Sequence, residues 1–235
     1  MTRYEIASLF AQKQFIKRNF IYKKSLHWRY IVYRVARPCL KVVYKVYKLF
    51  HPTTPWTSQT SIRIFKVLLN KEMTGFEYGS GNSTIFFAQR LKHLTSIEHQ
   101  QQWYEIVVKR MKALKISNVD YQFIPPEKSM APLDDTLLQS LGSLEKDFHV
   151  RSEYQEYFTR IARYPHNHFD FILVDGRARV ECAMLAIPRL KPGGIFVLDN
   201  SDRMRYRPIF HALRQWKMVN TTTGLFDTTF WFKPE

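Results

Sequence analysis

Residues 75–84, GFEYGSGNST, decide how this sequence folds. Gly75 to Tyr78 is a short β-prone run that leads directly into Gly79-Ser80-Gly81, and the apolar stretch Ile85 to Arg90 that follows has a helical pattern. Glycines directly after a strand let the backbone turn sharply and approach a ligand closely. The start of a helix after them presents free N–H groups, which attract an anion. The stretch therefore predicts a strand, a ligand-binding turn and a helix, with a plain tight turn as the alternative.

Strands and helices alternate from residue 61 to the end of the chain. The pattern predicts further strands at residues 94–98, 119–124, 169–174 and 195–198, and helices at 61–69, 103–114, 154–164, 178–190 and 206–216. Residues 191–194 are expected to form a turn and residues 126–150 a surface insertion. Two β-prone pieces, 221–226 and 228–232, follow each other as an antiparallel hairpin at the edge. Alternation of this kind predicts a doubly wound α/β sheet whose ligands lie at the carboxyl ends of the strands.

Composition limits the class of protein. The chain has 235 residues, 45% of them hydrophobic and 15% aromatic, which is enough for one α/β domain with an appendage and excludes disorder of the whole chain. Two cysteines, Cys39 and Cys182, exclude a disulfide scaffold and fit a reducing compartment. The sequence has no apolar run of about 18 residues and no signal-peptide pattern. We therefore expect a cytoplasmic protein.

The positive charge is concentrated in residues 1–50. This segment holds 12 of the 36 Lys and Arg but only one of the 20 acidic residues, Glu5, within a net charge of +16. The asymmetry predicts a basic helical extension at 1–51 and a separate domain at 52–235. Within the extension, Pro38 is expected to separate two helical stretches.

The second helical stretch of the extension is amphipathic. Lys41, Lys45 and Lys48 form a basic stripe, and Val42 and Leu49 are among the apolar and aromatic residues that cover the rest. Such a helix suits an anionic membrane surface, so the protein is expected to be peripheral on the inner face of a membrane. Packing of the extension on the rest of the chain and binding of RNA phosphates are the alternatives.

Two glutamates have positions that suit a nucleoside ligand. Glu77 precedes Gly79 by two residues, where an acid suits a ligand with a positive amino group and a carboxylate rather than a diphosphate. Glu98 ends the second strand, 19 residues after Gly79, where an acid can accept both ribose hydroxyls. A surface carboxylate is the alternative for Glu98.

Oxygen side chains follow two later strands. Asp175 comes directly after 169–174, and Asp199 and Asn200 follow 195–198. Three hard oxygen ligands at one edge of a sheet suit Mg²⁺. In the alternative, Asp199 caps the next turn and Asp175 holds the ligand or a neighbouring arginine. Arg177 and Arg179 favour an anionic acceptor, unless they pair with Glu181 or Asp202.

The combination of motifs resembles the class I S-adenosylmethionine-dependent methyltransferase superfamily. The segments that carry the resemblance are FEYGSGNSTIFFA (76–88), SIEHQQQWY (96–104), DFILVDGRARVEC (170–182) and LKPGGIFVLDN (190–200). The resemblance implies a Rossmann-like seven-stranded methyltransferase sheet with helices on both faces, and S-adenosyl-L-methionine as cofactor. It also implies cofactor contacts for Glu77, Gly79, Ser80, Gly81, Asn82, Ser83 (at the cofactor carboxylate), Glu98 (at the ribose), His99 (beside the adenine) and Asp175 (near the transferred methyl).

Asp175 with Asp199 and Asn200 also resembles the metal triad of catechol and caffeoyl-CoA type O-methyltransferases, although Gly176-Arg177-Ala178-Arg179 departs from their pattern. The Asn-Pro-Pro-Tyr signature of amino-group methylation is absent after residues 169–174.

We therefore expect methyl transfer to a hydroxyl of a small-molecule, glycan or lipid-linked acceptor near a membrane, with Asp175 and Asp199 as candidate bases and His99 and His211 as weaker ones. An RNA methyltransferase that uses the basic segment and a non-catalytic cofactor-binding scaffold are the alternatives.

Overall fold

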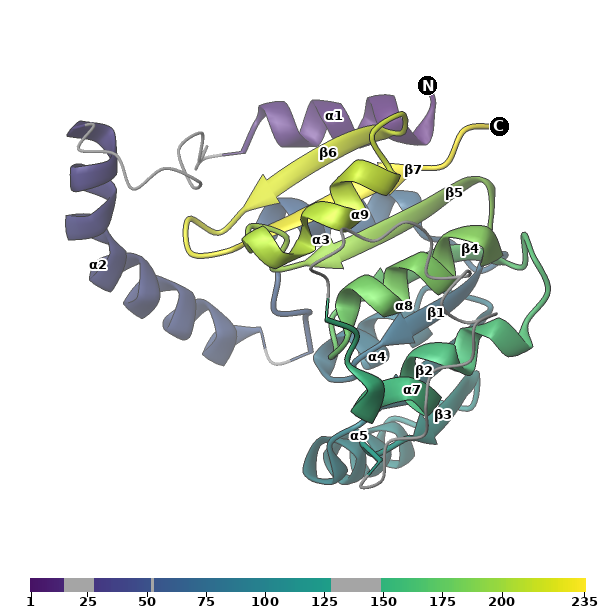
Figure 1. Cartoon of the computed structure of the whole chain (residues 1–235). Helices are drawn as coiled ribbons and strands as arrows, with labels where there is room; N and C mark the ends of the chain where they lie inside the picture. The colour runs from purple at the N-terminus through teal and green to yellow at the C-terminus, as the bar shows by residue number, and fades with distance from the viewer. Residues whose placement is uncertain (15–27, 52, 128–148) are drawn as a thin grey trace.

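The computed structural model describes residues 1–14, 28–51, 53–127 and 149–235, and its centre is one seven-stranded sheet (Figure 1). The strand order is β3-β2-β1-β4-β5-β7-β6. Strands β1 to β5 pair in parallel, and β7 pairs antiparallel with both β5 and β6. The predicted doubly wound sheet with an antiparallel hairpin at its edge is therefore confirmed. The strands are β1 (Thr74–Tyr78), β2 (His93–Glu98), β3 (Val119–Phe123), β4 (Phe169–Val174), β5 (Leu190–Asp199), β6 (Lys217–Thr222) and β7 (Asp227–Phe232).

Helices cover both faces of the sheet, as buried parallel strands require. Side chains of β4 alternate between two hydrophobic clusters, so that Ile172 packs with α8 on one face and Leu173 packs with α3 and α4 on the other. The helices are α1 (Arg3–Gln12), α2 (Trp28–Phe50), α3 (Gln59–Leu68), α4 (Asn82–Ala88), α5 (Gln101–Ala113), α7 (Gln155–Thr159), α8 (Arg179–Ala186) and α9 (Arg207–Ala212). Single 3₁₀ turns lie at Ser152–Tyr154, Arg160–Arg163, Ile187–Arg189 and Met204–Tyr206.

Helix α1 packs on the sheet domain. Thr2 and Glu5 form a reciprocal capping box at its start. Ala7 is fully buried in the hydrophobic cluster that contains α3, and the Tyr4 ring meets the Phe232 ring edge to face at 5.9 Å. The guanidinium of Arg3 donates to the carbonyl of Gly193 at 2.9 Å. The first helix of the basic segment is thus tied to β6, β7 and α3.

Helix α2 lies to one side of the sheet and is visibly bent (Figure 1). It runs through Pro38 without ending, so the prediction that Pro38 separates two helical stretches is wrong. A proline inside a helix removes one backbone hydrogen bond and crowds the preceding turn, and a bend relieves both effects. Among the described residues, no helix is long and apolar enough to cross a membrane.

Several predicted boundaries are also wrong. Residues 191–194, expected as a turn, lie within β5, because the strand starts at Leu190 opposite Phe169 and shifts register before Ile195. Gly193 has φ +66° and its N–H donates to the carbonyl of Lys233, so the C-terminal tail extends this ladder. The helices expected at 154–164, 178–190 and 206–216 are shorter and are flanked by 3₁₀ turns. Most of the insertion expected at 126–150 lies outside the described residues.

Candidate functional site

The loops after β1 and β4 touch through two glycines. Gly79 has φ +87°, and a Cβ built on it would lie 2.6 Å from the nitrogen of Gly176. The N–H of Asp175 donates to the carbonyl of Tyr78 at 2.8 Å, which holds the two loops together. Both the conformation and the close approach exclude a side chain at position 79. A Cβ on Gly81 would meet nothing within 4 Å, so the turn is open on that side.

Glu77 is a buried carboxyl group with one unused oxygen. It is fully buried, and its Oε2 accepts hydrogen bonds from the hydroxyls of Thr84 and Ser96, each at 2.6 Å. Its Oε1 has no hydrogen-bond partner among the described residues. Burial raises the pKa of Glu77 from 4.5 to about 7, against the opposing effect of the hydroxyls of Ser83, Ser96 and Thr84. A cationic N–H donor at Oε1 would satisfy this oxygen and favour its charge.

Glu98 is the centre of a hydrogen-bond network at the end of β2. Its Oε2 accepts from the N–H and the hydroxyl of Ser80, both at 2.8 Å, and its Oε1 accepts from the N–H groups of His99 and Gln100. Burial pushes the pKa of Glu98 up, but hydrogen bonds from His99, Gln100 and Ser80 hold it below its ordinary value. The hydroxyl of Ser80 also lies 2.6 Å from that of Tyr121. Glu98 is therefore ionised, and a ribose hydroxyl could replace the Ser80 hydroxyl at Oε2 or the His99 ring, whose Nδ1 lies 3.0 Å from Oε1.

The remaining residues of the glycine turn lie at the start of α4. Asn82 accepts a hydrogen bond from the guanidinium of Arg110, which extends from α5. Ser83 is buried in the first turn of the helix. The structure thus places Glu77, Gly79, Ser80, Gly81, Asn82, Ser83, Glu98, His99 and Asp175 at the carboxyl ends of β1, β2 and β4.

Arg179 lies among the oxygens that were predicted to bind a metal. Its guanidinium, only 8% exposed, donates to the carboxylate of Asp175 at 2.9 Å and contacts the side-chain oxygen of Asn200 at 3.5 Å. It also donates to the backbone carbonyls of Asp175, Gly176 and Asp199. The carboxyl of Asp199 accepts instead from the Thr228 hydroxyl at 2.7 Å. Burial, with the charge of Asp175 next to it, raises the pKa of Asp199 well above its ordinary value.

The side-chain oxygens of Asp175, Asp199 and Asn200 do not fit the predicted Mg²⁺ site, because other groups of the chain already contact them. A guanidinium already pairs with Asp175, and the carboxyl of Asp199 accepts a hydrogen bond from the Thr228 hydroxyl. A small cation bound by Asp175, Asp199 and Asn200 would compete with the buried Arg179 for the side-chain oxygens of Asp175 and Asn200. An i,i+4 arginine supplies positive charge at this edge of the sheet, and the predicted metal has no support from the structure or the comparisons.

A cavity of about 780 Å³ runs from the end of β2 past Asp175 to the segment after β5. His99 and Gln100 line one end, and residues 203–208 line the other. Asp175 is 39% exposed at its side chain and faces this space, whereas Asp199 is 5% exposed. His211 is exposed on α9 and is not among the cavity residues.

Two tyrosines near the site were not predicted. Tyr157 of α7 is fully buried, its hydroxyl has no hydrogen-bond partner among the described residues, and a Cβ on Gly176 would lie 2.0 Å from that hydroxyl. Tyr44 of α2 packs against Phe226 at 5.4 Å. Burial, with the charges of Asp199 and Asp175, raises the pKa of Tyr44 well above its ordinary value. No local sequence signal marks either residue, because each reaches the site from a distant element.

No protein-family model and no curated protein matches the sequence. Among solved structures, the chain is similar to a methyltransferase-like protein from Silicibacter pomeroyi, with 24% identity, a TM-score of 0.50, and 74% of this chain and 86% of the other covered. It is also similar to an rRNA methylase from Streptococcus thermophilus (14% identity, TM-score 0.49, 74% and 95% covered). A third similar structure is SMU.1697c from Streptococcus mutans in complex with SAH (13% identity, TM-score 0.48, 73% and 95% covered). Together with the strand order, the first similarity shows that the chain has the Rossmann-like fold of class I methyltransferases.

Proposed function

We propose that this chain, which has the class I methyltransferase fold, is an S-adenosylmethionine-dependent methyltransferase that acts on a hydroxyl acceptor near a membrane surface. The observation that carries the proposal is the unused Oε1 of Glu77, buried directly beneath the glycine turn. The methionine part of the cofactor bears an ammonium group, which is the donor that this oxygen lacks. Gly81, where a Cβ would meet nothing within 4 Å, then lets the ligand lie against bare backbone.

The other residues of the site supply the remaining cofactor contacts. Glu98 is ionised and would accept from the ribose hydroxyls in place of the Ser80 hydroxyl. His99 lies beside it, with its ring 5.6 Å from that of Tyr157, and would border the adenine. Ser83 and the first N–H groups of α4 would meet the carboxylate. S-adenosylmethionine supplies an electrophilic methyl group on a sulfonium, so the protein mainly has to align the acceptor with it.

Asp175 is the better of the two candidate bases. Its carboxylate borders the cavity, and burial raises its pKa against the charge of Arg179, so it can accept the proton of an acceptor hydroxyl as the new C–O bond forms and the bond from sulfur to the methyl group breaks. Asp199 is buried, bonded to Thr228 and favours its protonated form, which suits it to positioning rather than proton abstraction.

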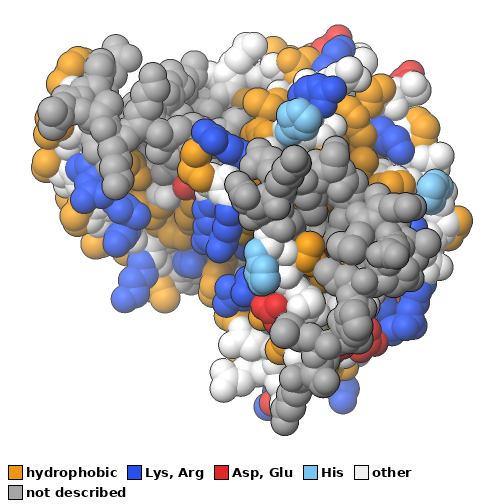
Figure 2. Space-filling model, in the orientation of Figure 1, with side chains coloured by type: hydrophobic (Ala, Val, Ile, Leu, Met, Phe, Trp, Pro, Cys, Tyr) orange, Lys and Arg blue, Asp and Glu red, His pale blue; other side chains and the backbone are white. Residues whose placement is uncertain are grey.

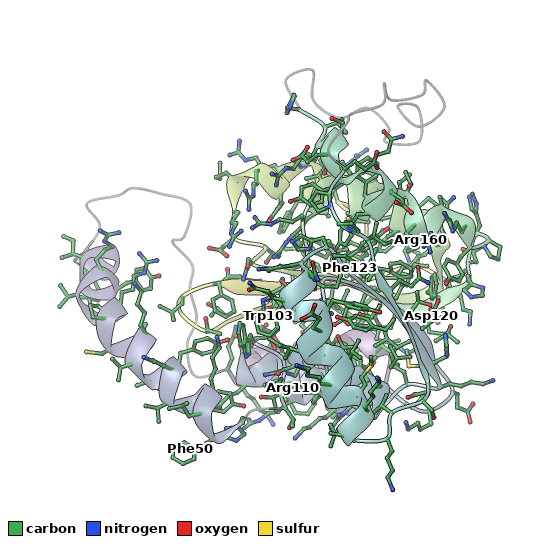
Figure 3. The ribbon with its side chains drawn as sticks, turned by 90° about the horizontal axis from the view of Figure 1, so that it is seen from below. Phe50, Trp103, Arg110, Asp120, Phe123 and Arg160 are labelled. Carbon is green, nitrogen blue, oxygen red and sulfur yellow. The ribbon has the colours of Figure 1, made fainter. Side chains whose placement is uncertain are left out.

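Helix α2 is the part of the chain that we propose to contact a membrane. Within the helix, Lys and Arg are the only charged residues, and its large apolar side chains recur at spacings of three and four, which puts them on one face. Phe50, 78% exposed, points away from the sheet at the end of this helix (Figure 3). The exposed apolar side chains are Trp28, Ile31, Val32, Val35, Val42, Val43, Val46, Leu49 and Phe50.

The inner side of α2 contacts the rest of the chain through Lys48 and Tyr44. The ammonium of Lys48 lies 3.5 Å from the centre of the Trp56 ring. The Trp56 ring in turn meets the ring of Trp103, which Figure 3 labels on α5. Tyr44 approaches the carboxyls of Asp199 and Asp175 closely enough to feel their charge. A membrane beneath the apolar face of α2 would therefore lie near the acceptor cavity, which favours a lipid-linked or membrane-proximal acceptor.

Calorimetric titration of S-adenosylhomocysteine into the full chain tests the cofactor assignment. We expect binding by the wild type, loss of binding in Gly79→Val, and a ten- to hundredfold weaker affinity in Glu98→Ala, because hydrogen bonds to a charged group contribute about 1.5–3 kcal/mol. Glu105→Ala removes an exposed acid of α5 and should bind like the wild type. Equal affinity in all four proteins would show that the turn and Glu98 do not hold the ligand.

The acceptor class is tested with S-adenosylmethionine that carries a labelled methyl group. Membrane, glycan, RNA and small-molecule fractions are incubated with the wild type and with Asp175→Asn. We expect label to enter a membrane or small-molecule fraction with the wild type only. Label in RNA alone would replace the hydroxyl proposal with RNA methylation, and cofactor binding without label in any fraction would favour a scaffold.

A further inference from the structure

The cavity of about 780 Å³ beside Asp175, called the acceptor cavity here, is lined by more arginines than residues of any other type. Its lining contains six guanidinium groups and two imidazoles but only two carboxyl groups, Asp175 and Glu181. Asp175 is already paired with Arg179, and Glu181 is 1% exposed and accepts from the backbone N–H of Arg151. Within the part of the chain that the structure describes, little negative charge therefore remains to balance the cavity. The six arginines are Arg151, Arg177, Arg179, Arg203, Arg205 and Arg207.

Four of these guanidinium groups are exposed and, within the described residues, bonded to no carboxylate. Arg203 reaches only the side-chain oxygen of Asn200, at 3.2 Å, and Arg205 reaches only the hydroxyl and ring of Tyr206. Arg177 and Arg207 make no ion pair in that part of the chain. In Figure 2, Lys and Arg side chains are prominent across the centre of the visible face. A concentration of like charge in one hollow focuses the electrostatic potential there and attracts anions.

The arginines come from separate segments and converge on one hollow. Arg177 follows β4, while Arg203 and Arg207 follow β5, so the cavity lies between two neighbouring strand ends. Asp175, the proposed base, lies on the same wall. A volume of about 780 Å³ suits a small ligand rather than a nucleic-acid duplex, which needs an extended basic track.

We infer that the cavity binds a phosphate or diphosphate group of a small hydroxyl-bearing acceptor, beside the point of methyl transfer. Guanidinium groups match phosphate oxygens in paired hydrogen bonds, and four of them exceed what a single carboxylate can neutralise. That the bound molecule is a methyl acceptor rests on the proposed function. The anion site itself depends only on the residues that line the cavity. Both soluble phosphate esters and lipid-linked phosphates carry this chemistry.

Inorganic pyrophosphate is the first probe, titrated into the full chain in a calorimeter. We expect one site in the wild type, and about a hundredfold or more weaker affinity in the double variant Arg177→Gln/Arg207→Gln, because each of the two lost charged contacts weakens binding about tenfold or more. Arg214→Gln removes an exposed arginine outside the cavity and should bind pyrophosphate like the wild type. S-adenosylhomocysteine affinity should stay within about twofold in all three proteins, which also shows that they are folded.

The outcomes separate this inference from the proposed function. Wild-type S-adenosylhomocysteine binding without pyrophosphate binding, or equal pyrophosphate affinity in the double variant, would overturn the anion site alone. Pyrophosphate binding without S-adenosylhomocysteine binding would overturn the methyltransferase proposal and keep the anion site. An RNA oligonucleotide that needs Arg177 and Arg207 while pyrophosphate does not bind would make the ligand RNA and the inference wrong.

A second pair of probes distinguishes the source of the phosphate. Glycerol 3-phosphate and its dihexanoyl derivative share one phosphate and differ in acyl chains. Equal displacement of pyrophosphate by the two supports a soluble ester, and stronger displacement by the acylated probe supports a lipid-linked one. Displacement by neither would contradict a phosphate-bearing acceptor.

Discussion

Replacing Glu77 by glutamine should change the pH dependence of stability in a way that only a buried carboxyl group explains. Burial raises its pKa from 4.5 to about 7, so the folded chain keeps a proton that the unfolded chain has released at intermediate pH. Because the pKa is raised on folding, the associated stability is present at low pH and is lost as the pH rises through about 7. Linkage gives a loss of about 2.5 kcal/mol between pH 5 and pH 8.

Glu77→Gln removes this titration and keeps an acceptor oxygen for Thr84 and Ser96. Urea denaturation of both proteins at pH 5 and pH 8 measures the effect. We expect the difference in the free energy of unfolding, variant minus wild type, to rise by about 2.5 kcal/mol between the two pH values. Glu72→Gln, at an exposed position just before β1, should leave the difference unchanged.

The same substitution should weaken cofactor binding. At pH 8 an ionised Glu77 and the ammonium of the ligand form a charged hydrogen bond, which Gln cannot replace, so we expect S-adenosylhomocysteine to bind ten- to hundredfold more weakly. A variant that follows the pH profile of the wild type, or binds the ligand equally well, would refute the reasoning about Oε1.

Further predictions follow from the same contacts. Wild-type affinity for S-adenosylhomocysteine should fall about tenfold between pH 8 and pH 6, as Glu77 gains its proton; calorimetry at both values checks this, and a flat profile would contradict it. Excess chelator should leave methyl transfer intact, because Arg179 fills the place of a metal; activity that is lost and restored by Mg²⁺ would contradict this. Arg179→Met should lower the free energy of unfolding by about 3 kcal/mol in urea titrations, because it removes a buried cation from five acceptors, and an unchanged midpoint would argue against that role. Val42→Glu/Leu49→Glu should abolish co-sedimentation with anionic vesicles, whereas Val67→Glu on α3 should not; pelleting of both variants like the wild type would exclude the apolar face of α2.

The sheet could be predicted because its signals are local. A strand followed by Gly79 and Gly81, and a buried run at 169–174 followed by Asp175, fix the carboxyl edge from a few residues each. The start of β5 could not be predicted in this way, because Lys191 to Gly194 are held in the strand by Lys233, a residue at the far end of the chain. Pro38 was misread for another reason: a bend and a break have the same sequence signal, and only packing decides between them.

Contacts between site residues of one segment could be expected from the sequence. Contacts between residues of distant segments could not. Asp175 and Arg179 are four residues apart, which was enough to suggest an ion pair but not to show that the guanidinium also takes the carbonyl of Asp199. Tyr157 reaches Gly176 from α7, and Tyr44 reaches the same edge from α2. Long-range placement of this kind has no periodic pattern in the sequence.

The most direct measurement is a crystal structure of the full chain soaked with S-adenosylhomocysteine. We expect the amino group of the ligand within hydrogen-bond distance of Glu77 Oε1, its ribose hydroxyls on Glu98, and its sulfur facing the cavity beside Asp175. A ligand bound elsewhere, or a ligand in this place with Glu77 Oε1 still unpaired and Glu98 still bonded only to Ser80, His99 and Gln100, would contradict the proposed site.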